Sequence, residues 1–549
     1  MSRCQYVTTA IDYPNAPRPH MGQVLEKVLA DVVARWFRLR GDEVRFQIGT
    51  DEHGVKIQRT AEREKLTPKE LVDRNVPAYI ELYRRIGISY DEPDGFIRTT
   101  DRKRHWPTVI ELWKRLKKAG MLEKRTYTGL YCQGCERFMT KRDLVDGKCS
   151  NHNAVPESVS EENWFFLLSK ESKWLKALLT KEWKGGPRSE ARPSGGYRIV
   201  PASRAHETLS LIEQGLEDVS FSRPKSSLSW GIPVPGDPDQ VMYVWCDALT
   251  NYISGLDYFG AGGLSEVVHH ERAGDVSRLG VEWWNKAEIT HVIGKDIARF
   301  HALIWPAMLK HAGVRTPDRL LIHGFLTNEG QKMSKTIGNV VEPEEVLKKF
   351  DGNPDPLRFY LSHEIPVGND GDFSWKRIEE IYDSKLRNRL GNLLNRVLVM
   401  FGVIGRALSP TFSYKGSMNV EGLIETHLEF YSTNMDNLEI DWGVKAVITI
   451  LDNCNGLITH AAPWQESKSL EEKRLILTEF AEGLRHVALM LLPFIPKTAK
   501  EISSQLNVPY ADKMLERDFV ITAEMKKWGS QKDWKSVGEP KILFPPLEK

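Results

Sequence analysis

The sequence predicts an α/β protein built on a parallel sheet, with an insertion in the sheet and an all-helical domain after it. Strand and helix patterns alternate over the first 115 residues, which is typical of an α/β fold. The pattern changes between about 120 and 240, where three of the six cysteines lie. From about residue 386 onward, strand patterns fade and long stretches of helical periodicity follow.

The first elements make a βαβ unit. A short β-rich run at 6–11 is followed by a loop rich in proline and glycine at 13–22. Apolar residues then recur with helical spacing at 24–39, and an apolar strand follows at 44–48. A strand, a loop, a helix and a strand in this order favour a parallel sheet.

Residues 120–240 are predicted to form an insertion between two halves of one sheet. This region contains a polar stretch rich in glycine and proline at 184–196, which is typical of a loop or linker. The strand pattern resumes at 242–245 and again at 291–293. These two runs are therefore the predicted strands of the second half of the sheet.

The C-terminal region is predicted to be helical. Three stretches show long apolar periodicity, at 386–404, 442–457 and 475–492, which indicates a helical bundle. The proline-containing tail at 540–546 is unsuited to a helix and is expected to pack back on the protein as a strap.

Composition narrows the class of protein. The chain has 549 residues, a length that corresponds to about three to four domains, and 41% of the residues are hydrophobic, which is enough to form their cores. Its 76 basic and 74 acidic residues nearly balance, which excludes a histone-like binder and still permits a local basic face. Six cysteines exclude a disulfide scaffold, and no apolar run reaches the ~18 residues of a membrane helix. We therefore expect a cytoplasmic protein with no membrane association and no signal peptide.

Two motifs indicate phosphate binding. The sequence HMGQ at 20–23 follows the first strand and opens a helix, where backbone N–H groups face an anion. Gly22 permits close approach of a ligand, and His20 can donate to phosphate oxygens. The loop KMSKT at 332–336 carries two lysines that can close over a polyphosphate. Each motif alone could be a surface loop, but two such motifs bordering one sheet are specific.

A cluster of thiols and a histidine indicates zinc. Cys132 and Cys135 form one pair and Cys149 and His152 another, each with two intervening residues. This spacing suits tetrahedral zinc, and four protein ligands leave no open position, so the site would be structural. A redox pair or unpaired structural thiols are the alternatives. A redox pair would lie at a strand-to-helix turn of a thioredoxin-like unit, which the sequence does not indicate.

Further stretches stand out at 6–11, at GTDEHG (49–54), at YVWCDAL (243–249) and at IGKDI (293–297). Together with the two phosphate motifs, they resemble the methionyl-tRNA synthetases, a family of class I aminoacyl-tRNA synthetases. The resemblance covers nearly the whole chain. It implies a Rossmann-type nucleotide-binding core with a zinc-bearing insertion, followed by an all-α anticodon-binding helical domain. The implied parts are core halves at 1–119 and 241–325, a connective insertion with a zinc knuckle at 120–240, the KMSKS loop and a stem-contact segment at 326–385, and the helical anticodon domain with its C-terminal strap at 386–549.

Methionine has a polarisable thioether that suits aromatic contacts, and its ammonium group needs a carboxylate. Aromatic residues and one aspartate of the chain can supply both, and the resemblance implies the rest of the set. The residues implied to bind methionine are Ile11, Tyr13, Asp51, Trp245, Ala248, Leu249, Tyr252, Ile297 and His301. Those implied to bind ATP are His20, Gly22, Gln23, Gly294, Asp296, Leu326 and Lys335, and the implied catalytic residues are His20, Gln23, Lys332 and Lys335. Those implied to read the anticodon are Asn392, Arg396 and Trp464. The implied cofactors are one structural Zn²⁺ per chain and Mg²⁺ with ATP.

We therefore expect a monomeric ligase that activates L-methionine with ATP and transfers it to initiator and elongator methionine tRNA. Two alternatives remain open. A synthetase for leucine, isoleucine or valine would carry a much longer insertion with an editing domain than the roughly 120 residues found here. A catalytically inactive relative that binds tRNA is favoured by Gln23, which stands where the motif has histidine. The intact lysine loop and Asp51 oppose that second alternative.

Overall fold

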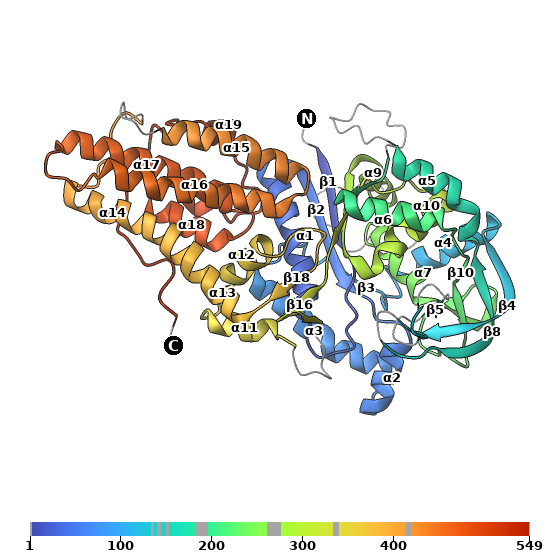
Figure 1. Ribbon diagram of the computed structural model, residues 1–549. Helices are drawn as coiled ribbons and strands as arrows, with labels where there is room; N and C mark the ends of the chain where they lie inside the picture. The colour runs from blue at the N-terminus through green and yellow to red at the C-terminus, as the bar shows by residue number, and fades with distance from the viewer. Residues whose placement is uncertain are drawn as a thin grey trace.

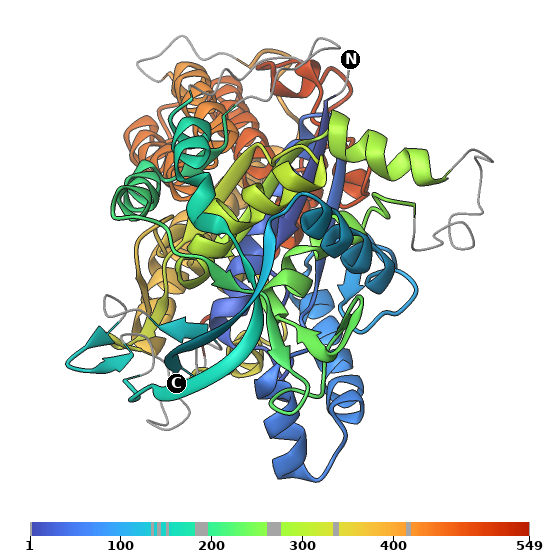
Figure 2. The ribbon, with the colours of Figure 1, turned by 90° about the vertical axis from the view of Figure 1, so that its right-hand side faces the viewer.

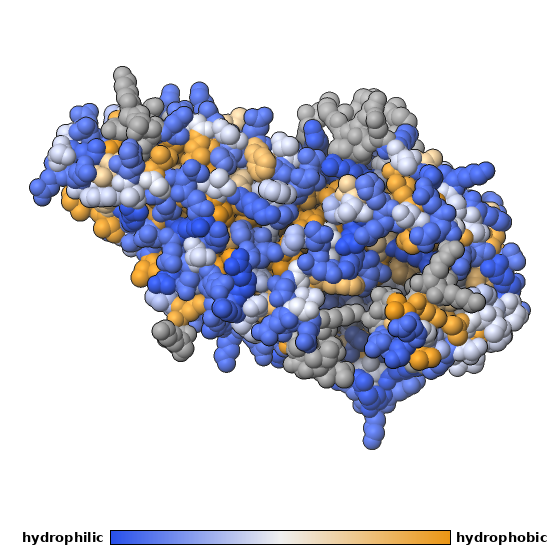
Figure 3. Space-filling view, viewed as in Figure 1, coloured by the Kyte–Doolittle hydropathy of each residue, from blue (hydrophilic) through white to orange (hydrophobic). Residues whose placement is uncertain are grey.

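The structure is a computed structural model that describes residues 3–132, 137–139, 144–149, 153–181, 196–260, 276–332, 340–412 and 419–547. Within these ranges, no helix is both long enough and apolar enough to cross a membrane. The core sheet lies between a helical domain on the left of Figure 1 and the insertion on the right. On the face seen in Figure 3, hydrophilic residues dominate and hydrophobic residues form separate patches.

A parallel sheet forms the core. Its strands lie in the order β3 (Phe96–Arg98), β2 (Glu43–Thr50), β1 (Cys4–Thr9), β14 (Glu288–Gly294), β15 (Arg319–His323) and β9 (Arg198–Val200). All neighbouring pairs in this sheet are parallel. From β1 the chain proceeds outward to β2 and β3, and from β14 it proceeds outward to β15 on the other side. The switch point between β1 and β14 is where ligands of such sheets bind, beyond the carboxyl ends of the strands.

Helix α1 (Met21–Leu39) confirms the helix predicted at 24–39 and begins three residues earlier. It packs on β1, β2 and β14. The predicted strands at 6–11 and 44–48 are confirmed as β1, which begins and ends two residues earlier, and β2. The other core helices are α2 (Val55–Glu64), α3 (Pro68–Ile86), α4 (Trp106–Lys118), α9 (Val276–Lys286) and α10 (Trp305–Ala312).

The insertion is built around a long antiparallel pair, β4 (Leu122–Cys132) and β8 (Glu157–Phe166). Figure 2 shows this pair bending across the front of the molecule. The smaller elements around it are β5 (Arg137–Met139), β6 (Leu144–Val145), β7 (Lys148–Cys149), α5 (Ser172–Thr180), α6 (Ala202–Glu213), β10 (Val219–Ser220), β11 (Ser222–Pro224), β12 (Pro233–Val234) and β13 (Asp237–Met242).

One strand inside 120–240 belongs to the core sheet, contrary to the expectation that this whole stretch lies outside it. β9 pairs in parallel with β15, and α6 packs against β9. The strand has only three residues and follows the stretch rich in glycine and proline. Because such a short run carries no information about its partner, the sequence pattern could not assign it to the core sheet.

The strand predicted at 242–245 is wrong. β13 ends at Met242, and the short helix α7 (Val244–Leu249) begins two residues later, followed by α8 (Asn251–Ser254). Valine and tryptophan favour strands, but the helix places Trp245 and Ala248 on one side, where tertiary packing decides the conformation. The strand predicted at 291–293 is confirmed as the middle of β14.

A small sheet and three helices connect the core to the helical domain. They are β16 (Leu326–Asn328), β17 (Gln331–Lys332), α11 (Pro343–Lys349), α12 (Asp355–His363), β18 (Gly371–Phe373) and α13 (Trp375–Ile381). The domain itself consists of a π-helical stretch (Tyr382–Gly391) and the helices α14 (Asn392–Ile404), α15 (Val420–Asp436), α16 (Ile440–Ala461), α17 (Leu470–Leu491) and α18 (Pro496–Gln505). The predicted helices at 386–404, 442–457 and 475–492 are thereby confirmed.

A buried interface joins the helical domain to the core. Arg358 of α12 forms a fully buried ion pair with Asp31 of α1 (2.7 Å) and donates from Nε to the carbonyl of Phe494 (2.7 Å). Trp36 Nε1 of α1 donates to Asp436 of α15 (2.8 Å). Burying an ion pair is favourable only when the remaining polar atoms are also satisfied, so this interface requires a defined geometry.

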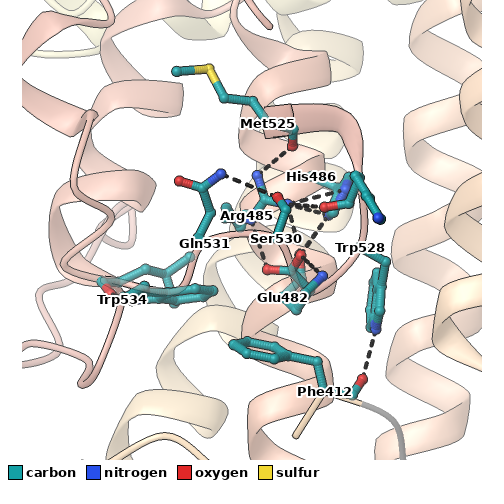
Figure 4. A network of polar contacts seen from close by, with 12 residues as sticks. Phe412, Glu482, Arg485, His486, Met525, Trp528, Ser530, Gln531 and Trp534 are labelled. Atoms are coloured by element: carbon teal, nitrogen blue, oxygen red, sulfur yellow. Dashed lines mark hydrogen bonds and ion pairs between the residues drawn. The ribbon is translucent and has the colours of Figure 1, made fainter. Parts of the chain in front are cut away.

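The C-terminal segment packs back onto the bundle (Figure 4). Arg485 of α17 pairs with Glu482 and donates to the carbonyl of Met525 (2.7 Å), just inside the short helix α19 (Ala523–Lys526). Glu482 Oε1 also accepts from the backbone N–H of Gly529 (2.8 Å), and Trp528 stacks on His486 at 5.5 Å. Further along, the tail is not helical, as predicted, and Phe544 is buried against Tyr382.

Candidate functional site

A cleft of about 460 Å³ opens beyond the carboxyl ends of β1 and β14, at the switch point of the sheet. All six predicted ATP-binding residues that the structure describes line it, namely His20, Gly22, Gln23, Gly294, Asp296 and Leu326. From the predicted methionine set, Ile11, Tyr13 and Ile297 line it as well. The structure therefore brings residues of three separate motifs to one cavity, whose volume suits a nucleotide-sized ligand.

The start of α1 fixes the His20 side chain. Its Nδ1 accepts hydrogen bonds from the backbone N–H groups of Gly22 (3.1 Å) and Gln23 (3.4 Å). In return, Gln23 Oε1 accepts from the His20 N–H (2.9 Å), which completes a capping box. Because Nδ1 accepts, the proton of the neutral ring lies on Nε2, which can donate to an anion. A Cβ at Gly22 would lie 3.1 Å from the His20 ring, so glycine keeps the ring in this position.

Buried charges behind this motif are functional candidates that the sequence analysis missed. The fully buried Lys27 ammonium donates to Asp12 Oδ1, Glu26 Oε1 and the carbonyl of Ala10, each at 2.9 Å. Burial raises the pKa of Asp12 to about 6, although the charge of Lys27 opposes the shift. Asp12, Glu26 and His323 also line the cleft. The sequence did contain a signal for these residues, because two adjacent charged residues, at 26 and 27, lie inside an otherwise apolar helix. Buried charges need partners, so such a pair indicates a buried polar cluster.

An aromatic cluster continues from the cleft into the core. His301 Nδ1–H donates to the carbonyl of Ile297 (3.0 Å), and the Tyr252 hydroxyl donates to His301 Nε2 (2.6 Å). Burial lowers the pKa of His301 to about 4, so its ring is neutral at pH 7. Trp245 stacks on Phe300 with ring centroids 3.9 Å apart and meets His301 edge-on at 6.3 Å. The structure thus joins Trp245, Tyr252 and His301 into one wall.

The remaining predicted methionine-binding residues are buried; they are Asp51, Ala248 and Leu249. Asp51 directly follows β2, and its N–H donates to the carbonyl of Asp12 (2.8 Å), a residue of the cleft. The hydroxyl of Tyr13 donates to the carbonyl of His53 (2.7 Å). The loop that carries Asp51 is therefore tied to the cleft at two points.

The second predicted site lies on the helical domain, toward the left of Figure 1 and away from the sheet. Asn392 and Arg396 lie one turn apart at the start of α14. The guanidinium of Arg396 lies 5.4 Å from the ring of Trp464, which follows α16 and is 49% exposed. The structure therefore brings Arg396 and Trp464 together on the surface, where the ring remains accessible to a ligand.

Comparison with known proteins identifies the family of the chain. Residues 5–154 and 141–398 match the family described as "tRNA synthetases class I (M)", and residues 415–531 match "Anticodon binding domain of methionyl tRNA ligase". The chain is 37% identical over 558 residues to the methionine–tRNA ligase of Caldanaerobacter subterraneus subsp. tengcongensis, covering 100% of this chain and 80% of that one. It is 35% identical over 557 residues to the methionine–tRNA ligase of Rickettsia conorii, covering 100% of both chains. The chain belongs to the methionine–tRNA ligase family.

A solved structure of the same family supports the fold. The Mycobacterium tuberculosis methionyl-tRNA synthetase in complex with methionyl-adenylate superposes with a TM-score of 0.83 at 32% identity, over 99% of this chain and 100% of that one. The chain is accordingly a methionine–tRNA ligase with a class I parallel-sheet core and a helical anticodon domain. The family match rules out a synthetase for leucine, isoleucine or valine.

Several predicted residues of this ligase lie outside the described residues. They are Lys335 of the KMSKS loop and the predicted zinc ligands Cys135 and His152. For Lys332, the structure describes only the backbone, in β17. The other two predicted zinc ligands, Cys132 at the end of β4 and Cys149 in β7, are both buried in one small cluster. Among the residues described, no group of three or more possible metal ligands occurs, and that part of the chain holds only two of the four predicted.

Proposed function

We propose that this ligase forms methionyl-adenylate from L-methionine and ATP in the cleft between β1 and β14. It then transfers methionine to the 3′ end of initiator and elongator methionine tRNA. The observation that carries the proposal is the assembly of six predicted ATP-binding residues on one cleft at the switch point. ATP–pyrophosphate exchange that depends on L-methionine and needs no tRNA tests the first step. A purified enzyme without such exchange would contradict the proposal.

The first step needs no general base, because the carboxylate of methionine is already a nucleophile when it attacks the α-phosphorus of ATP. Catalysis then consists of positioning and of stabilising charge on the phosphates. His20 would donate from Nε2 to the triphosphate, and Gln23 would hold His20 and offer its amide N–H groups from the same side. Lys332 and Lys335 would close over the triphosphate from the opposite loop. Mg²⁺ bound with ATP supplies further neutralisation of phosphate charge.

The adenosine end would lie at the turn after β14. A Cβ at Gly294 would lie 2.8 Å from Asp296 Oδ1, so glycine allows the carboxylate to lie close to this turn, where it would meet the ribose hydroxyls. Leu326, at the start of β16, supplies an apolar surface for the adenine. These contacts bind ATP in the ground state and place its α-phosphorus beside the methionine site.

The methionine site would extend from the cleft along the aromatic wall. Asp51 is the carboxylate that would bind the α-ammonium group, while Ile11 and Tyr13 line the entrance. The thioether would be surrounded by the aromatic wall (Trp245, Tyr252 and His301) and by the apolar side chains of Ile297, Ala248 and Leu249. A neutral His301 suits this role, because an apolar side chain gains nothing from a buried charge.

Replacing Trp245 by alanine is expected to raise the KM for methionine by about ten- to a hundredfold, because pocket contacts are worth ~1–3 kcal/mol. The loss of the ring should also relax the rejection of smaller apolar amino acids, and the KM for ATP should stay near the parental value. Steady-state exchange kinetics measure all three. Trp174, half-buried on α5, provides the control Trp174→Ala, which should change neither KM. If the Trp245→Ala variant keeps the parental KM for methionine, Trp245 does not contact the substrate and serves only in the packing of the core.

We propose a structural zinc held by Cys132, Cys135, Cys149 and His152. The burial of Cys132 and Cys149 in one small cluster supports it, because a structural zinc site needs four Cys or His ligands and these two thiols, brought together from different strands, can supply two of them.

Elemental analysis of protein purified in metal-free buffer should find one zinc per chain. Cys149→Ser should release it, whereas Cys454→Ser, at a buried thiol of α16, should retain it. The site is refuted if the parent holds less than half an equivalent while its thiols react freely.

We also propose that Asn392, Arg396 and Trp464 read the anticodon. A base can stack on the accessible face of Trp464, and the amide and guanidinium groups can bond base edges or phosphates. The contact of Arg396 with Trp464 supports a shared surface. In this proposal the parts of the enzyme are core halves at 1–119 and 241–325, the KMSKS loop with its stem-contact segment at 326–385 and the anticodon domain at 386–549. The connective insertion at 120–240 also contributes the edge strand β9 to the core sheet.

A further inference from the structure

A buried carboxylate on α7 holds two histidines from distant parts of the chain. Asp247, which is 1% exposed, accepts hydrogen bonds from His53 Nδ1 (2.6 Å) and from His105 Nε2 (2.6 Å). His53 lies in the loop after β2, and His105 lies at the start of α4. The other ring nitrogen of His105 is hydrogen-bonded to Ser254 Oγ of α8 (2.7 Å). One carboxylate therefore connects four separate elements.

Three of these elements, the loop after β2, α7 and α8, carry residues of the proposed methionine site. Asp247 lies on α7 between Trp245 and Ala248, and Ser254 lies in α8 with Tyr252. His53 is two residues from Asp51. The carboxylate itself does not line the cleft, so it can act only through the residues that it holds.

The hydrogen bonds and the packing around Asp247 hold the two histidines in defined positions. Burial alone would raise the pKa of Asp247, but the charge of His53 and the hydrogen bonds of both histidines outweigh burial and lower it. Asp247 is therefore a carboxylate that accepts from both rings. The His53 ring also packs against Trp106 (5.9 Å) and Trp230 (5.3 Å), so it cannot follow a displaced partner without repacking.

We infer that Asp247 is a positioning residue for methionine binding, which fixes the loop of Asp51 relative to the aromatic wall on α7 and α8. The inference rests on the proposed function, which places methionine between these two parts. If the ammonium and the thioether are bound by different elements, their separation must match the length of the substrate. A displacement of ~1 Å between such elements can cost about a hundredfold in rate.

The first test is Asp247→Ala, measured by exchange kinetics with methionine and ATP varied separately. We expect the KM for methionine to rise at least about tenfold and the KM for ATP to change less than about twofold, since the cleft contacts of ATP remain. Glu171 offers a matched control, because it is also buried and binds His311 (2.8 Å) and Lys310, and none of these three residues lines the cleft. Glu171→Gln should leave both constants near the parental values.

A second pair of variants keeps the test valid if Asp247→Ala does not fold. His105→Gln retains a donor at the position of Nε2, whereas His105→Ala removes it. Because the ring of His105 is hydrogen-bonded to Asp247 and Ser254 and does not line the cleft, we expect His105→Ala to raise the KM for methionine and His105→Gln to restore most of the loss.

Two outcomes would overturn the inference. One is an equal rise in both KM values for His105→Ala or Asp247→Ala, which would indicate general damage to the fold. The other is an unchanged methionine KM in these variants although Asp51→Asn raises it. If Asp51→Asn itself leaves the methionine KM unchanged, the proposed methionine site fails instead, so the two failures can be told apart.

Discussion

Replacing His20 by alanine is expected to lower the rate of methionyl-adenylate formation by about 10²–10³-fold, the usual effect of removing one donor to a charge that develops in the transition state. The structure gives the physical reason. The Nδ1 atom accepts from the backbone N–H groups of Gly22 and Gln23, so in the neutral ring Nε2–H is the donor that we expect to contact the triphosphate. The contact should strengthen as charge shifts onto pyrophosphate, so kcat should fall more than the KM for methionine rises.

The measurement is single-turnover adenylate formation together with equilibrium binding of methionine. His206, an exposed histidine on α6, provides the control His206→Ala, which should behave as the parent. Losses of equal size in rate and in methionine binding would show that His20 acts on the ground state and would contradict its role as a donor to the transition state.

Replacing Trp464 by alanine is expected to lower aminoacylation of methionine tRNA by about ten- to a hundredfold, because stacking a base is worth ~1–3 kcal/mol and ~1.4 kcal/mol is a factor of ten. Exchange without tRNA should remain parental, because Trp464 follows α16 in the helical domain and does not line the cleft. The variant also leaves Arg396 without the ring that its guanidinium covers. We therefore expect the loss mainly in kcat/KM for tRNA.

The same bundle contains an unusually close control. Trp442, in the first turn of α16, is also 49% exposed and also lies under a cation, Lys445, at 4.4 Å. Trp442→Ala should leave aminoacylation near the parental rate, because this ring lies at the opposite end of α16 from Trp464. A parallel loss of aminoacylation and exchange in Trp464→Ala would indicate a structural role. Equal losses in the two variants would place the anticodon contact elsewhere.

Local sequence patterns predict those parts of the fold and of the site that are determined by interactions between residues close together in the sequence. The helix at 24–39 follows from apolar spacing, and the capping box that fixes His20 is contained within residues 20–23. The residues of the cleft lie at or beyond the carboxyl ends of β1, β14 and β15, but only the motif at 20–23 could be assigned from local pattern. Gly294, Asp296 and Leu326 were predicted from the family resemblance.

Contacts between distant residues could not be predicted in this way. The placement of β9 beside β15 and the helix at Val244–Leu249 depend on tertiary packing that overrides local preference. The bonds of Asp247 to His53 and His105 join parts of the chain that periodicity treats as independent. The burial of Lys27 between acidic groups is likewise a property of the assembled core.

The amino-acid dependence of ATP–pyrophosphate exchange by the parent enzyme, without tRNA, tests the central claim most directly. We expect exchange with L-methionine. With leucine, isoleucine or valine we expect a kcat/KM that is lower by at least about tenfold, the lower range of discrimination by pocket shape. Exchange that is absent with methionine, or equally fast with one of the other three amino acids, would contradict the assignment of the cleft and its aromatic wall to methionine activation.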